Sequence, residues 1–172
     1  DNATLLGAAL GPSSLDTCLT HHQHQLQRLQ GNLGELYAHD AFFLLKNCLA
    51  LPKLLYTLRT SPCFTRLDAL QGFDNCIKEA LSRITNVEVT TLQWKQATLP
   101  CKFGGMGMPD TCYLASSAYI SSYRACLPVA RRISATIDNS VFAQEALHHW
   151  TQETQEDVPD SCHQSSWTLP LH

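Results

Sequence analysis

Four side chains that can bind nucleic acid lie along one apolar segment of the sequence. Lys46 and Lys53 are seven residues apart, Tyr56 follows three residues later, and Arg59 lies near the end of the segment. On an α-helix, residues seven apart share a face. Cations beside an aromatic ring can follow a nucleic-acid backbone, because they neutralise phosphates while the ring packs against a sugar or base. The alternative is that both lysines extend from a core helix into solvent.

Cysteine and histidine spacing does not match a standard metal site. The sequence has eight cysteines and no Cys-x-x-Cys pair, and we expect them to be buried free thiols. The best zinc candidate combines His148-His149 with Cys162-His163, but this spacing fits no common tetrahedral set. We therefore expect no metal ligands in this chain.

Glycines cluster in the segment LPCKFGGMGMPD. Gly104, Gly105 and Gly107 resemble a phosphate-binding loop only in composition, because the Gly-Lys-Ser/Thr ending is missing. A packed structural turn explains them better, since glycine permits positive φ and close approach of the backbone. No local pattern indicates a catalytic nucleophile, and we expect no catalytic residues or cofactor here.

Apolar periodicity predicts a mainly α fold, arranged as a helical bundle after a short N-terminal strand or turn. A leucine seam predicts a first helix that starts after Ser13 or Ser14 and ends near Gln30. Further helices are expected over residues 41–60, 65–84, 91–97, 111–126 and 138–154, with a kink at Pro52 and an interruption at Pro128. The predicted core consists of Leu44, Leu45, Leu55, Leu58, Leu70, Phe73 and Ile77.

Charge divides the chain into a weakly basic body and an acidic end. All twelve Lys and Arg residues precede residue 133, whereas six acids lie from Asp138 onward. We divide the chain into residues 1–12, a helical domain over 13–137, an acidic helix over 138–154 and a disordered tail over 155–172. The sequence starts at Asp1 and shows neither a leader pattern nor an uninterrupted apolar span. We expect a piece of a longer reading frame that is intracellular, nuclear or cytoplasmic, and not in a membrane.

Three ordered segments resemble reverse transcriptases of non-LTR retrotransposons. LLGA at residues 5–8 resembles the Leu-Gly turn of their primer-grip region, which assigns the role to Leu6 and Gly7. HDAFFLLKNCLALPKLLYTLRTSPCF at residues 39–64 resembles the helical segment downstream of that turn. ATLPCKFGGMGMPD at residues 97–110 resembles a recurrent Leu-Pro and Gly-Gly-Leu-Gly-Ile element. The likeness covers about residues 4 to 135.

The resemblance implies the thumb and post-thumb part of an RNA-directed DNA polymerase, with residues 1–12 as the remnant of the palm. The family holds two Mg²⁺ ions in its palm, on a Tyr-x-Asp-Asp motif expected before Leu5, and no Asp-Asp pair occurs in this sequence. We therefore expect an inactive fragment that grips a template–primer duplex through Lys46, Lys53, Tyr56 and Arg59 without reading its sequence. Its other partners would be the palm and fingers of the parent enzyme. The alternative is an independent helical module that binds protein.

Overall fold

The computed structural model describes residues 3–134 and 140–168 and confirms the predicted class, a mainly helical bundle with a short N-terminal hairpin. The N-terminal half contains β1 (Thr4–Leu5), β2 (Ala8–Ala9), α1 (Pro12–Leu33), α2 (Ala38–Leu44), the π-helical turn η1 (Leu45–Leu49) and α3 (Leu51–Thr60). After the 3₁₀ turn η2 (Cys63–Thr65) come α4 (Leu67–Thr85), α5 (Thr91–Thr98), the 3₁₀ turn η3 (Cys101–Phe103), α6 (Thr111–Ile133), α7 (Val141–Thr154) and α8 (Gln164–Thr168).

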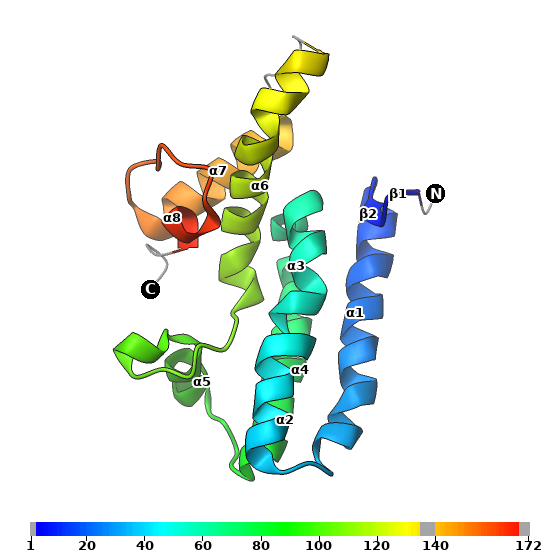
Figure 1. Cartoon of the computed structure of the whole chain (residues 1–172), viewed down its shortest axis with the longest axis vertical. Helices are drawn as coiled ribbons and strands as arrows, with labels where there is room; N and C mark the ends of the chain where they lie inside the picture. Colours follow the sequence, from blue (N-terminus) through cyan, green and yellow to red (C-terminus); the bar gives the residue numbers. More distant parts are fainter. Residues whose placement is uncertain (1–2, 135–139, 169–172) are drawn as a thin grey trace.

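Helix α3 lies at the centre of the bundle. It contacts α6 on one side and α1 on the other, while α4 packs against both α1 and α6 (Figure 1). Helices α7 and α8 pack against α6. The segment that contains α5 lies at the opposite end of the molecule from the tip of α6 (Figure 1). The core joins Leu45, Leu54 and Leu58 to residues of α4, which are Leu70, Phe73 and Ile77.

Helix α1 begins earlier and ends later than predicted. Gly11 is the N-cap, Pro12 occupies the first turn, and the Gly11 amide donates to Ser14 Oγ at 3.0 Å. Proline is well suited to this position, because its missing N–H would have no helical partner there. The helix continues past Gly31 to Leu33, because buried leucines on its seam hold the last turns against the bundle: Leu15, Leu19, Leu26 and Leu33.

The expected single helix over residues 41–60 is broken. The turn η1 closes a wider ring, with the Ala50 amide donating to the Leu45 carbonyl at 2.9 Å, and Ala50 leaves helical geometry at φ −74° and ψ −110°. Pro52 then sits in the first turn of α3. The extra residue in the π turn changes which side chains face the core. Leu44 is therefore 36% exposed, contrary to the prediction, and Leu54 is fully buried, while Leu55 is half-buried.

The segment Ala38–Thr60 is long and apolar enough to cross a membrane by length and composition alone. The same segment supplies Leu45, Leu54 and Leu58 to the core and is interrupted at Ala50. These are properties of a core helix, so its composition is weak evidence for a membrane span.

Two aspartates cap the first turn of α6, and the helix continues past its internal proline. Asp110 accepts from the Tyr113 amide, and Asp74 of α4 accepts from the amides of Thr111 and Cys112. Small buried side chains, Ala115 and Ala118 among them, let α6 lie close to α3. Pro128 was predicted to interrupt this helix, but α6 continues to Ile133, and its last turns project beyond the bundle (Figure 1).

The C-terminal segment is folded up to Thr168, so the predicted disorder over residues 155–172 is wrong for residues 155–168. Trp167 of α8 and Trp150 of α7 are both fully buried, with ring centroids 5.0 Å apart. Trp150 Nε1 donates to the Trp167 carbonyl, and Trp167 Nε1 donates to the Ser161 carbonyl, each at 2.8 Å. The acidic helix is present as α7, which is capped by Ser140, whereas its predicted start at Asp138 and residues 169–172 lie outside the described residues.

Candidate nucleic-acid interface

A groove of about 320 Å³ lies between α1 and the column formed by η1 and α3. Its polar lining comes from His22, Gln25, Arg28 and Asn32 of α1 and from Lys53 of α3. Apolar side chains complete the lining: Leu26, Leu29 and Leu49. The lining contains two permanent cations, two amides and no carboxylate. This combination favours an anion, because an anion would meet donors and positive charge without repulsion.

His22 forms the wall of this groove beside α3. Its Nε2 atom lies 3.2 Å from Thr57 Oγ1, while its Nδ1 atom is buried and has no hydrogen-bond partner. Burial lowers the pKa of His22 from its ordinary value of 6.5, and His21 and Lys53 lower it further. These effects favour the neutral ring.

The hairpin contacts Tyr56, one turn along α3 from Lys53. Leu6 and Gly7 form its two-residue turn, both at positive φ (51° and 83°), which matches the turn that suits the twist of paired strands. The Tyr56 hydroxyl donates to the Leu6 carbonyl at 2.7 Å. The Leu6 side chain is 90% exposed. The structure thus brings together Leu6, Gly7 and Tyr56, which the sequence analysis selected separately.

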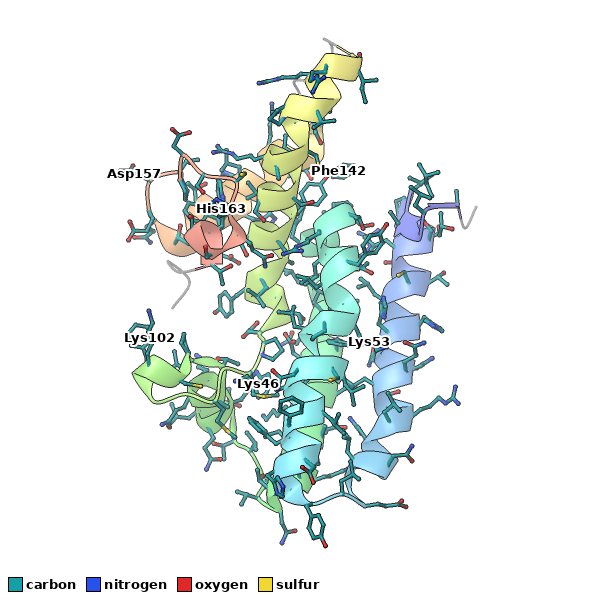
Figure 2. All side chains as sticks on the ribbon, viewed as in Figure 1. Lys46, Lys53, Lys102, Phe142, Asp157 and His163 are labelled. Carbon is teal, nitrogen blue, oxygen red and sulfur yellow. The ribbon has the colours of Figure 1, made fainter. Side chains whose placement is uncertain are left out.

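Lys46 does not share a face with Lys53, contrary to the prediction. Lys46 Nζ donates to the Met106 carbonyl at 2.7 Å and packs against Gly107, where an added Cβ would lie 2.9 Å from Nζ. Lys53 lines the groove beside α1, and the two labels lie on opposite sides of the helical column in Figure 2. Seven residues of continuous α-helix would have left the two side chains only about 20° apart. The π turn and the break at Ala50 separate them.

Arg59 also lies away from the groove. Its Nε and Nη2 atoms donate to Gln164 Oε1 at 3.1 and 2.6 Å, which ties α3 to α8. Of the four predicted contact residues, only Lys53 lines the groove, and Tyr56, one turn along α3, is bonded to the hairpin. Sequence analysis missed Arg28, Gln25 and Asn32, although the polar face of the first helix carried the signal at spacings of three and four residues.

The glycine turn is structural, as the sequence predicted. Gly104 and Gly107 have φ values of 78° and 64°. Gly105 lies so close to Leu99 that an added Cβ would be 1.9 Å from the Leu99 carbonyl oxygen. The turn is closed by amides of Met106 and Met108, which both donate to the Ala97 carbonyl, at 3.1 and 3.0 Å.

Asp74, Asp110 and Cys112 bring three ligand-type atoms within 4.8 Å of one another at the start of α6. The sequence did not predict this cluster, because its members lie on different elements. Burial raises the pKa of Asp74 to about 7, with a further contribution from Asp110. Burial and the Asp74 and Asp110 carboxyls also raise the pKa of the Cys112 thiol. Asp74 accepts from the amides of Thr111 and Cys112 and from Thr111 Oγ1, the last at 2.8 Å, so its role is to cap α6.

The raised pKa of Asp74 predicts a pH-dependent stability. The folded-state pKa of about 7 lies above the ordinary value of 3.8, so the folded protein binds this proton more tightly than the unfolded chain does. The associated stability is present below about pH 4 and is lost as pH rises through about 7. In urea titrations, Asp74→Asn should flatten this part of the stability profile, whereas Asp68→Asn, at an exposed position of the same helix, should leave it unchanged. Parallel profiles for the wild type and Asp74→Asn would contradict the assignment.

Comparison of the chain with protein families, curated proteins and solved structures gives no match.

Proposed function

We propose that this chain is the thumb and post-thumb part of a retroelement reverse transcriptase, and that it holds a template–primer duplex in the groove between α1 and α3. The observation that supports this proposal best is the carboxylate-free lining with Arg28 and Lys53. Tyr56, one turn along α3 from Lys53, is bonded to the Leu6-Gly7 hairpin. A polymerase must hold its duplex without reading bases, and phosphate contacts serve that purpose because they carry no sequence information.

Each side chain of the groove has a distinct role in this proposal. Arg28 and Lys53 neutralise phosphates, and Arg28 can also bind two phosphate oxygens at once through its planar guanidinium. Gln25 and Asn32 donate amide hydrogens to phosphate or sugar oxygens. Tyr56 holds the hairpin through the Leu6 carbonyl, so that the exposed Leu6 side chain can pack on the edge of the duplex.

In this proposal, the residues that catalyse nucleotide transfer belong to the palm of the parent polymerase. The family uses Mg²⁺, which prefers oxygen ligands in octahedral geometry. The cluster of Asp74, Asp110 and Cys112 does not fit that ion, because the Asp74 oxygens cap α6 and the third ligand is a soft thiol. The proposed partners are therefore the duplex and the palm and fingers of the parent polymerase, and the chain alone is inactive in this proposal.

Substitution of the groove cations should weaken duplex binding. Two or three cations neutralise few phosphates, so we expect weak, sequence-independent binding that falls with salt at a slope of about −0.9 per contact. Lys53→Ala and Arg28→Ala should each lower the affinity at low salt and make the slope shallower by about one contact. The measurement is a salt titration of duplex binding by fluorescence anisotropy.

Lys46→Ala is the matched control for this titration. Lys46 has the same chemistry on the same column, but it is bonded to the Met106 carbonyl outside the groove, so its loss should leave the salt slope unchanged. Equal effects of Lys46→Ala and Lys53→Ala would mean that the cations act only through net charge. Absence of duplex binding at low salt would refute the proposed function.

A protein-binding module is the second candidate, and a specific observation favours it. Lys46 and Arg59 do not join Lys53 in a basic stripe, while Tyr37, Phe43 and Leu44 are large apolar residues left exposed on α2 and its N-cap. A contiguous patch of exposed apolar side chains is typical of a protein contact, and these three residues are the candidates for one. If duplex binding is absent but Phe43→Ser abolishes a specific protein association, this second function replaces the first.

A further inference from the structure

One ionisable side chain in the groove is not used by the proposed phosphate contacts. His22 lies in the wall between the two helices, with His21 beside it on α1 and with Lys53 and Thr57 facing it from α3. The Cys18 thiol contacts the same Thr57 hydroxyl. Arg28 lines the same groove. The surroundings of the imidazole thus contain cations and thiol or hydroxyl groups, and the groove lining offers no carboxylate to pair with a charged ring.

The hydrogen bonds of His22 suit a neutral ring with its proton on Nε2. That Nε2–H can donate to Thr57 Oγ1 at 3.2 Å, and Nδ1 is buried without a partner. In this tautomer, protonation would place an N–H at Nδ1 with no acceptor, which is costly in a buried position. The protonated ring must therefore turn out of the wall to find an acceptor, and the groove lies beside it.

We propose that His22 is an additional, proton-dependent phosphate ligand of the groove, an inference that rests on the duplex-binding function proposed above. When a duplex enters, one proton moves from the solvent to the imidazole, and the resulting N–H donates to a phosphate oxygen. No other reactant is needed, and the proton returns to the solvent when the duplex leaves. The free-state pKa of His22, which burial, His21 and Lys53 lower, agrees with a ring that is neutral until an anion arrives.

Linkage between the proton and the duplex sets the expected result. Because the bound state holds the proton more tightly, duplex affinity must rise as pH falls, and by at most about tenfold per pH unit for one proton. The same linkage requires the pKa of His22 to rise when duplex is added. The effect should be largest at low salt, where phosphate contacts are strongest.

The test is duplex binding from about pH 8 to about pH 5.5 at constant low ionic strength, using a short random-sequence DNA duplex. We compare the wild type with His22→Gln and with His24→Gln, an exposed histidine two residues away on the same helix that does not line the groove. His22→Gln should flatten the rise in affinity at low pH, while His24→Gln should keep the wild-type dependence. Equal pH profiles for the two variants would overturn the inference.

A second measurement protects the test against a misfolded variant. In the wild-type protein, the imidazole C–H resonances of His22 are titrated by NMR with and without the duplex, and the pKa should rise in its presence. An unchanged pKa with duplex bound overturns the inference but leaves the proposed function intact, provided that Lys53→Ala still weakens binding. No binding by the wild type at any pH overturns both.

Discussion

Replacement of Trp167 by alanine is expected to lower the free energy of unfolding by about 3–5 kcal/mol, the usual cost of truncating a fully buried aromatic residue. The side chain packs against Trp150 and under Arg124, whose guanidinium carbon lies 4.8 Å from the ring centroid. Arg124 also donates to the Pro159 carbonyl at 2.7 Å, so the ring, the arginine and the preceding segment form one unit. The loss would be a large share of a typical stability of about 5–15 kcal/mol.

Urea denaturation of the wild type and Trp167→Ala measures this effect, with Trp94→Ala as the control. Trp94 is the same residue type on α5, but it is only half-buried, so its loss should cost clearly less. Limited proteolysis should cut the Trp167→Ala protein after α7 sooner than the wild type. If both tryptophan variants are equally stable, the C-terminal segment is only loosely attached.

Gly105→Ala is expected to cost at least about 3 kcal/mol, the upper end of the range for overpacked sites. The added methyl carbon would lie 1.9 Å from the Leu99 carbonyl oxygen and 2.4 Å from the Leu99 carbonyl carbon. These are backbone atoms, and a rotamer change cannot move them. The Gly107 amide donates to the same Leu99 carbonyl at 2.9 Å, so any shift of Leu99 also breaks the closure of the turn.

Gly31→Ala is the matched comparison, and it is expected to raise the free energy of unfolding. An added Cβ at Gly31 meets nothing within 4 Å, and Gly31 lies inside α1. Alanine should therefore stabilise the helix by roughly 0.5–1 kcal/mol, because it restricts the unfolded chain more than glycine does. Thermal unfolding followed by circular dichroism reports both changes. A Gly105→Ala protein as stable as the wild type would show that the turn can open without cost.

Periodicity was sufficient to predict the helices that bury one clear face. Leu15, Leu19 and Leu26 lie on the buried seam of α1, and Leu70, Phe73 and Ile77 lie on that of α4, as predicted. The start of α6 at residue 111 was also predicted, and the short polar side chain of Asp110 before that start accepts from one of the first free amides of the helix. These helix faces and this helix start depend on residues close together in the sequence, so the spacing of apolar and polar residues determines them.

Features that depend on distant partners could not be predicted from spacing. The side of the column on which Lys46 lies depends on the π turn, and no single residue in the sequence indicates that turn. Trp167 is an isolated aromatic residue in a polar segment, and its contacts with Trp150 and Arg124 depend on partners far away in the sequence. The groove itself requires two helices far apart in sequence, so Arg28 and Lys53 could not be paired beforehand.

Leu6, at the tip of the hairpin, combines a left-handed backbone with an exposed side chain. Left-handed backbone geometry costs a residue with a Cβ roughly 1–2 kcal/mol of conformational free energy, whereas it costs glycine almost nothing. Leu6 adopts φ 51° and exposes 90% of its surface, so neither backbone preference nor burial accounts for leucine at this position. A change to glycine would relax the turn and remove the side chain in the same step. Under the proposed function, stability and the exposure of the Leu6 side chain to the duplex therefore compete at a single backbone torsion.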